Sequence, residues 1–284
     1  MSIRIVTDST SDIPESLADE HGVFVLPAYV NVGDDSYLDQ VQLSRSEFYE
    51  MLPSLSEPPT TAAPAVGAFT EAYDKLADEG AEEILSIHLS ANLSGMLNAA
   101  RLGAQATDAV QVTLFDSRQL SMGLGLLALT AAQDAAAGYT MEEITTRLQR
   151  RVGRTHVFAV LDTLEYLRRS GRVSWAAFGV GTLLRIKPLL HVFDGNVEMI
   201  ERVRTRGRAV RRLIEHVEAL GPLERLVILH TRNAEGAAAL GEEAAHLFPA
   251  QDQDDFLTVE VTPTIGAHIG PGALGFACLA AGEA

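Results

Sequence analysis

Short apolar stretches alternate with longer stretches of helix-forming residues along the first half of the chain. The short stretches have the length and composition of strands, and they lie at residues 3–6, 23–32, 84–89, 110–115 and 157–161. The longer ones predict helices at residues 44–51, 64–78, 93–106 and 119–139, with a further helix starting at Thr140. Strands separated by helices favour a parallel sheet covered on both faces. Residues 1–160 therefore predict one α/β domain.

The pattern changes after residue 161. Residues 186–193 and 197–203 are rich in β-forming residues, and the Asp-Gly-Asn sequence between them predicts a hairpin. Helices are expected at residues 208–220 and 234–247, and strands at 226–230 and 256–261. Residues 161–284 therefore predict a second, α+β domain. We expect its closing segment, residues 262–280, to contribute to a ligand site between the two domains.

Polar loops stand next to several of the predicted strands and helices. They lie at residues 7–11, 58–61, 90–95 and 116–118. In α/β domains such loops converge on a crevice at the carboxyl edge of the sheet, although helix capping alone explains any single one of them.

We expect Asp12 to cap a helix that has Pro14 in its first turn, and Thr140 to form a capping box with Glu143. Glycines and prolines surround His268 in residues 262–272, where an imidazole can donate a hydrogen bond to an anion.

Composition narrows the class of protein. The chain has 284 residues, 47% of them hydrophobic, and a formal charge of −16, which argues against nucleic-acid binding. Its one cysteine, Cys278, cannot form an internal disulfide, so we expect a cytoplasmic protein. No signal peptide or membrane span is expected. Residues 146–225 form a basic segment, which fits an acidic partner, a phosphate group or a solvated surface.

Several common functional motifs are missing from the sequence. It contains no dinucleotide-binding glycine motif, no Walker A motif, no zinc-protease motif and no hydrolase nucleophile elbow. Nucleotide binding by this chain is therefore not expected.

Six segments, in order along the chain, resemble those of the DegV family of bacterial fatty-acid-binding proteins, which includes the B subunits of fatty acid kinase. They are residues 6–14, the Pro-Thr-Thr-Ala-Ala-Pro sequence at 59–64, Leu-Ser-Gly at 93–95, residues 164–174, Lys-Pro-Leu-Leu at 187–190, and His-Ile-Gly-Pro-Gly at 268–272. The resemblance implies a two-domain α/β fold that encloses one long-chain fatty acid, such as palmitate. It also implies that Thr61, Ser94 and His268 hold the carboxylate.

In the kinase systems a separate ATP-binding subunit phosphorylates the bound acid. The resemblance therefore implies a lipid-binding subunit without enzyme activity, cofactor or metal, and possible transient membrane contact. We assign partner or phosphoryl contact to Arg169, Arg172 and Arg202 in the basic segment, together with Arg204. Apolar residues of the second domain are candidates for the acyl tunnel or for ordinary core: Phe178, Leu183, Leu184 and Ile186.

The chain departs from the family pattern at several positions. Ala62 and Ala65 replace hydroxyl residues, Ala63 replaces a glutamine, and Met96-Leu97 replaces Thr-Tyr, which affects the expected acyl preference. Two other functions stay open. One is a serine hydrolase that uses Ser94, His268 and an acid such as Asp8. The other is a lipid sensor or reservoir without a kinase partner.

Overall fold

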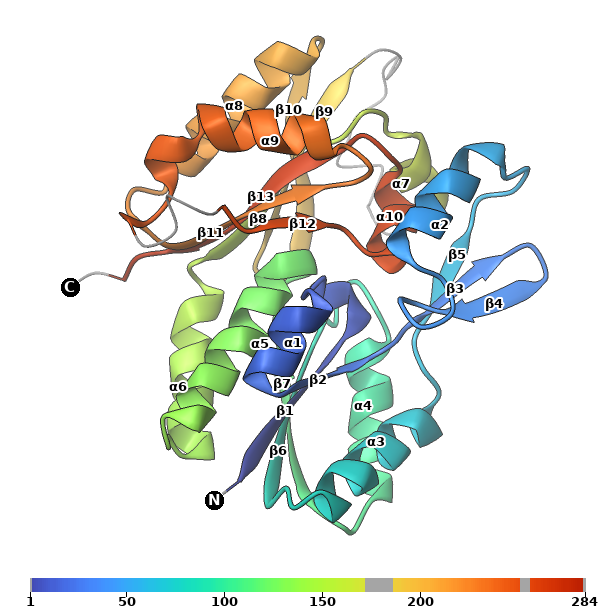
Figure 1. The fold of residues 1–284 in the computed structure, drawn as a ribbon, viewed down its shortest axis with the longest axis vertical. Coiled ribbons are helices and arrows are strands. Elements are labelled where there is room, and N and C mark those ends of the chain that lie inside the picture. The colour runs from blue at the N-terminus through green and yellow to red at the C-terminus, as the bar shows by residue number, and fades with distance from the viewer. Residues whose placement is uncertain (1, 172–185, 251–255, 283–284) are drawn as a thin grey trace.

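The computed structural model describes residues 2–171, 186–250 and 256–282. It contains a four-stranded parallel sheet in the order β2-β1-β6-β7 (Figure 1). The strands are β1 (Ile3–Asp8), β2 (Val23–Leu26), β6 (Glu83–His88) and β7 (Gln111–Asp116). The predicted α/β class and its parallel sheet are confirmed.

Helices cover both faces of this sheet. Alternate residues of a strand point to opposite faces, so Ile5 packs with one set of helices and Val6 with the other. The first set is α1 (Glu15–His21), α5 (Ser121–Ala136) and α6 (Met141–Val152). The second is α3 (Val66–Asp78) and α4 (Met96–Ala106). The Thr140–Glu143 capping box of α6 is present as predicted.

A six-stranded sheet lies above the parallel one, in the order β10-β9-β8-β13-β11-β12 (Figure 1). Its strands are β8 (Thr155–Val160), β9 (Lys187–Phe193), β10 (Asn196–Val203), β11 (Leu223–His230), β12 (Thr258–Glu260) and β13 (Leu274–Ala280). The sequence pattern grouped residues 157–161 with the first sheet. Backbone pairing instead joins β8 to β9 and β13, because strand pattern does not reveal which sheet a strand enters.

Helix α5 lies between the two sheets. It contacts β1 of the parallel sheet and also β8, β11 and β13 of the six-stranded sheet. This position explains why its sequence, rich in alanine and leucine, has no polar face. Helices α8 (Arg206–Glu218) and α9 (Ala234–Glu243) cover the other face of the six-stranded sheet.

The third sheet is a small antiparallel one in the order β4-β3-β5, formed by β3 (Tyr29–Val32), β4 (Asp35–Leu38) and β5 (Thr60–Ala62). The single strand predicted at residues 23–32 was wrong, because the chain leaves the parallel sheet at Pro27 and enters this one. The Ala28 N–H donates to Ser9 Oγ at 3.1 Å instead of to a neighbouring strand. Strand β5 lies where the sequence predicted a turn. Helix α2 (Arg45–Met51) follows β4.

The closing segment supplies a helix and a strand. Helix α10 (Pro263–Ile269) packs against α2, β3 and β5 and against α7 (Glu165–Ser170). Strand β13 then enters the interior of the six-stranded sheet, between β8 and β11. The closing segment therefore connects the small sheet with the six-stranded sheet.

The prediction that Asp12 caps a helix was wrong. Helix α1 begins at Glu15 after Pro14, and Asp12 has a left-handed backbone with φ of 57°. Its carboxylate points into the protein, where it accepts the Thr262 N–H at 2.8 Å and the Ser121 hydroxyl hydrogen. Asp12 thus joins the start of the chain to α5 and to the closing segment.

The β9–β10 hairpin also touches the parallel-sheet half. The Gly195 N–H donates to the carbonyl oxygen of Arg118 at 2.8 Å, and the Arg118 guanidinium pairs with Asp194 at 2.7 Å. Gly195 has φ of 81°, and a Cβ atom there would lie 3.0 Å from both Ser90 Oγ and Asn92 Nδ2. We call this contact between the hairpin and the first half the hairpin clasp.

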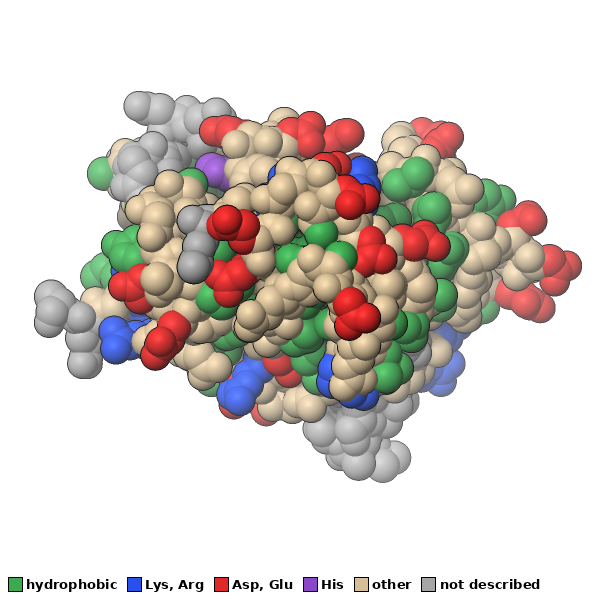
Figure 2. Space-filling model, turned by 90° about the horizontal axis from the view of Figure 1, so that it is seen from below, with side chains coloured by type: hydrophobic (Ala, Val, Ile, Leu, Met, Phe, Trp, Pro, Cys, Tyr) green, Lys and Arg blue, Asp and Glu red, His purple; other side chains and the backbone are tan. Residues whose placement is uncertain are grey.

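Acidic side chains are common on the surface, as the net charge of −16 leads one to expect. Figure 2 shows acidic side chains distributed over one face, with most of the visible basic ones toward its lower edge. Among the described residues, no helix is both long and apolar enough to cross a membrane.

Candidate functional site

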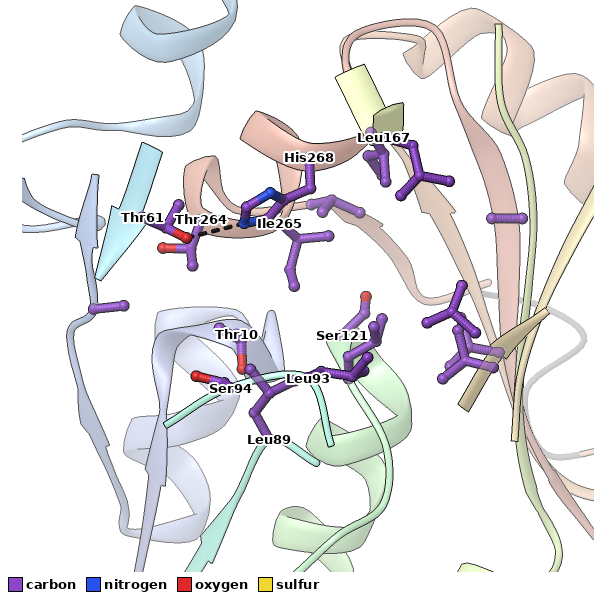
Figure 3. Close-up of a pocket in the computed structure, with 18 of the residues that line it drawn as sticks. Thr10, Thr61, Leu89, Leu93, Ser94, Ser121, Leu167, Thr264, Ile265 and His268 are labelled. Atoms are coloured by element: carbon purple, nitrogen blue, oxygen red, sulfur yellow. Dashed lines mark hydrogen bonds between the residues drawn. The ribbon is translucent and has the colours of Figure 1, made fainter. Parts of the chain in front are cut away.

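A cavity of about 740 Å³ lies between the carboxyl edge of the parallel sheet and the inner face of the six-stranded sheet (Figure 3). This volume is in the range of small-molecule sites, about 300–1,000 Å³. Most of its wall is apolar and comes from both halves, including Leu89, Leu93, Leu120, Val157, Ala159, Leu161, Leu167, Leu190, Val192, Val197, Leu229, Ile265 and Ile269. The polar members of the wall are Thr10, Thr61, Asn92, Ser94, Asn98, Ser121, His230, Thr264 and His268.

Thr61 and His268 meet at one end of the cavity. Strand β5 pairs with β3, which places Thr61 opposite Val30, and α10 lies against this small sheet. As a result Thr61 Oγ1 and His268 Nε2 lie 2.9 Å apart, within hydrogen-bond distance (Figure 3). Two residues predicted for the site are therefore brought into direct contact.

Ser94 lines the same cavity, just before α4. Its hydroxyl oxygen accepts the Met96 N–H at 3.2 Å. The first amides of a helix carry partial positive charge, which favours a negatively polarised ligand atom. All three predicted contact residues thus border one cavity. The neighbouring Ala62, Ala63 and Met96, where the chain departs from the family pattern, line it too.

Three further hydroxyl groups of the wall are backed by buried carboxylates. Thr10 donates to Asp8, Ser121 to Asp12, and Thr264 to Asp39. Burial raises the pKa of Asp12 to about 6 and also raises the pKa of Asp39, in both cases against the lowering effect of the donated hydrogen bonds.

Asp8 belongs to a buried chain of polar side chains. Its carboxylate accepts the Thr10 and Leu89 N–H groups at 3.0 and 3.2 Å and lies 2.8 Å from His88 Nδ1. His88 Nε2 lies 2.7 Å from Ser86 Oγ, which lies 2.8 Å from the Tyr73 hydroxyl. Burial raises the pKa of Tyr73 to about 12. Ser86 and His88 are fully buried, so this serine, histidine and aspartate cannot reach a substrate.

The hydrolase hypothesis named Asp8 as one candidate for the acid partner of His268. The structure contradicts that role, because both carboxylate oxygens of Asp8 are engaged by Thr10, His88 and Leu89. Ser94 and His268 do border the same cavity. The proposed triad therefore loses Asp8, the one acid named for it.

Three polar wall residues lie outside every predicted polar segment: Asn98 on α4, Ser121 and His230. Ser121 lies at the start of an apolar helix and His230 at the end of β11. Burial lowers the pKa of His230, while its Nδ1 accepts the Asn233 N–H at 3.3 Å. A polar residue at a strand end or helix start was the available signal, but it is common in proteins without such sites.

The predicted arginine contacts lie outside the described wall of the cavity. Arg169 is exposed on α7 and pairs with Glu165, and Arg202 is exposed on β10. Arg172 lies outside the described residues, as do the proposed tunnel residues Phe178, Leu183 and Leu184. Ile186 is described, but it packs in a small core beside the cavity with Leu161, Leu164 and Leu190. Within the described ranges, no group of three or more His, Cys, Asp or Glu residues is placed to hold a metal ion.

Comparison with known proteins gives consistent matches over nearly the whole chain. The family model described as "Uncharacterised protein, DegV family" matches residues 2–281. A DegV domain-containing protein of Deinococcus radiodurans is 39% identical over 284 residues, covering 98% of both chains.

Two solved structures are also similar. One is described as showing fatty acid binding of a DegV family protein from Thermus thermophilus. Its TM-score is 0.89 and its sequence identity is 32%. The match covers 99% of this chain and 100% of that one. The other, DegV from Bacillus subtilis, is described as a fatty acid binding protein. It has a TM-score of 0.87 and 31% identity, and the match covers 98% and 99%.

Proposed function

This chain belongs to the DegV family, and we propose that it binds one long-chain fatty acid, such as palmitate, in the cavity between its two larger sheets. The observation that carries the proposal is the contact between Thr61 and His268 at a polar end of a largely apolar cavity. The two similar structures described as fatty-acid-binding proteins support the same ligand class.

In this proposal Thr61, Ser94 and His268 hold the carboxyl group, and the apolar wall surrounds the acyl chain. A saturated chain with about fourteen buried methylene groups would gain on the order of 11 kcal/mol at roughly 0.8 kcal/mol each, before the costs of ordering. Burial of the chain supplies most of the affinity, and the hydrogen bonds at the carboxyl end fix the orientation of the ligand.

Mass spectrometry of the untreated purified protein tests this proposal. Spectra under native and then denaturing conditions should show one fatty acid per chain, released on unfolding. The double variant Thr61→Ala, Ser94→Ala should lose it, while Thr60→Ala should keep it because Thr60 is exposed and bonds Asn31. An empty protein that also fails to take up added fatty acids would contradict fatty-acid binding.

We further propose that the chain presents the acid to a separate ATP-dependent kinase subunit in the cytoplasm, which forms an acyl phosphate. The exposed Arg169, Arg202 and Arg204 fit an acidic partner surface or a transferred phosphoryl group. Reversal of Arg202 to Glu should weaken acyl phosphate formation with such a subunit but leave fatty-acid binding intact. Arg150→Glu, on the exposed side of α6, is the matched control.

Equal acyl phosphate formation by both arginine variants would contradict the interface. If no ATP-dependent subunit forms acyl phosphate from the loaded protein, the chain is a lipid reservoir or sensor without a kinase partner.

A further inference from the structure

We propose that the cavity takes its fatty acid as the neutral, protonated carboxylic acid rather than as the carboxylate. This inference rests on the proposed function, because it concerns the carboxyl group at the same end of the cavity. Its basis is the direction of the hydrogen bonds made by the hydroxyl groups of the wall and the charges buried behind them.

Thr264 lies one helical turn before His268 on α10, so both side chains are on the same face of the helix. Figure 3 shows Thr264 beside Thr61 at this end of the cavity. The Thr264 hydroxyl donates its single hydrogen to Asp39. A hydroxyl that has given away its hydrogen offers only lone pairs to a ligand. While Asp39 is ionised, Thr264 therefore acts as a hydrogen-bond acceptor toward the cavity.

The other contacts of Asp39 show that its carboxylate accepts hydrogen bonds. The Ser9 oxygen accepts the Ala28 N–H at 3.1 Å, and its own hydroxyl points to Asp39 at 2.8 Å. The other carboxylate oxygen of Asp39 accepts from the Gln40 amide at 3.3 Å. All of these partners can be donors, which is the environment of an acceptor-only carboxylate.

Thr10 repeats the arrangement beside Ser94 (Figure 3). Its hydroxyl donates to Asp8, which also accepts two backbone N–H groups and lies against His88 Nδ1. The hydrogen of Thr10 is therefore committed away from the ligand. Two wall hydroxyls near the predicted carboxyl contacts, Thr10 and Thr264, present acceptors to the cavity.

The remaining groups provide donors as well as acceptors, since the side-chain amides of Asn92 and Asn98 also line the wall. The bond between Thr61 and His268 uses one hydrogen of that pair, and Ser94 has one hydroxyl hydrogen. A carboxylate can only accept hydrogen bonds, so acceptors such as Thr10 and Thr264 would repel it. A carboxylic acid accepts through its carbonyl oxygen and donates through its hydroxyl. The neutral acid therefore matches a wall that holds both donors and acceptors.

The charges around the cavity favour the same form. Asp8, Asp12 and Asp39 are buried directly behind wall hydroxyls. A further negative charge in an apolar cavity would be disfavoured by burial, and also by these carboxylates wherever they are ionised. Within the described ranges, the cationic or basic groups that face or flank the site are His268, His230, His88, Arg45 and the first amides of α4. Glu260 flanks His230 on the acidic side.

The positive charge that these groups bring to the cavity is reduced by their surroundings. Burial lowers the pKa of His230, which favours its neutral form. His88 lies against Asp8, and the Arg45 guanidinium donates to the Asp12 carbonyl oxygen at 3.4 Å. His268 and the helix amides are the groups that could still favour a carboxylate. The protonation state of the bound acid is therefore the decisive observable.

Carbon-13 NMR of palmitate labelled at its carboxyl carbon measures this state directly. Native mass spectrometry first establishes one palmitate per chain, and the bound carboxyl resonance is then followed between pH 5 and pH 9. We expect the resonance to stay at the neutral-acid position at pH 6 and pH 7 and to move only at higher pH. A bound resonance at the carboxylate position at pH 6 overturns the proposal while leaving fatty-acid binding in place. A protein that binds no palmitate overturns both.

The variant Thr264→Val removes the acceptor while keeping the shape of the side chain. We expect the titration of bound palmitate to move to lower pH by one unit or more, whereas Thr60→Val, outside the cavity, should leave it unchanged. An unchanged titration in a loaded Thr264→Val protein contradicts the role of Thr264. If that variant does not fold, the titration of the unmodified protein still decides the proposal.

Discussion

Thr61 Oγ1 and His268 Nε2 lie 2.9 Å apart although 207 positions separate them in the chain. One side chain comes from an edge strand of the small antiparallel sheet and the other from the helix that precedes the central strand β13. The contact forms only when the closing segment packs against β3 and β5. The candidate site is therefore a product of the complete fold rather than of one loop.

Replacing His268 by alanine should weaken fatty-acid binding by about tenfold to a hundredfold. The variant removes the partner of Thr61 and a hydrogen-bonding group at the carboxyl end, and such losses are worth about 1–3 kcal/mol. Competition against a fluorescent fatty acid measures the change. His246→Ala, an exposed histidine that pairs with Glu218, should bind as the unmodified protein does. Equal affinity in both variants would remove His268 from the site.

Replacing Ala159 by leucine should shift binding toward shorter acyl chains. Ala159 lies on β8 between Leu190 and Gly275 and faces the cavity, so a larger side chain fills part of the volume. Relative affinities for saturated acids of increasing length measure the shift. Ala136→Leu, on the exposed end of α5, should leave the preference unchanged. The cavity would not hold the acyl chain near β8 if Ala159→Leu kept the original preference.

The hairpin clasp should depend more on Gly195 than on the Arg118–Asp194 ion pair. Both charged side chains are about half exposed, so Arg118→Ala should lower the free energy of unfolding by no more than about 1 kcal/mol. Gly195→Ala should cost about 1–3 kcal/mol, because it forces a Cβ atom against Ser90 and Asn92 and strains a left-handed backbone. Urea unfolding compares the two variants, and the reverse order would contradict this account.

Asp12→Asn should stabilise the protein at pH 7. The pKa of Asp12 is about 6 in the folded protein, above its ordinary value of about 4, so the folded state binds the proton more tightly than the unfolded state. The associated stability is present at pH 4 and is lost as the pH rises to 6. This loss amounts to at most about 3 kcal/mol at pH 7.

Urea unfolding of both proteins at pH 4.5 and pH 7 measures this effect. The gain from Asp12→Asn should be larger at pH 7 than at pH 4.5. A gain that does not depend on pH would show that Asp12 titrates normally in the folded protein.

Much of the fold follows from local sequence pattern. Residues 3–6 and 84–89 have the apolar strand pattern, Thr140 and Glu143 form the expected capping box, and the Asp-Gly-Asn turn joins β9 to β10. These features depend on neighbours along the chain. The small sheet was not predicted, because β4 and β5 are short, partly exposed strands, and β5 pairs with β3 from a distant part of the chain.

In the candidate site, too, local motifs could be predicted and contacts between distant residues could not. Thr61, Ser94 and His268 were selected from motifs, and all three border one cavity, although their roles remain predictions. Asp39 was not selected, since an aspartate in a loop gives no sign that Ser9 and Thr264 will point at it from other elements. Asp12 was misassigned for a similar reason: its partners Ser121 and Thr262 are distant in the sequence.

The position of β13 also bears on how the protein is made. A chain that leaves the ribosome from its N-terminus can complete the parallel sheet once β7 has emerged, because domains generally fold as units during synthesis. The six-stranded sheet must wait for β13, which separates β8 from β11. Until then the apolar surface of α5 has only one of its two sheets to cover it. Chaperones that recognise exposed apolar segments would therefore have access to this helix until β13 has emerged.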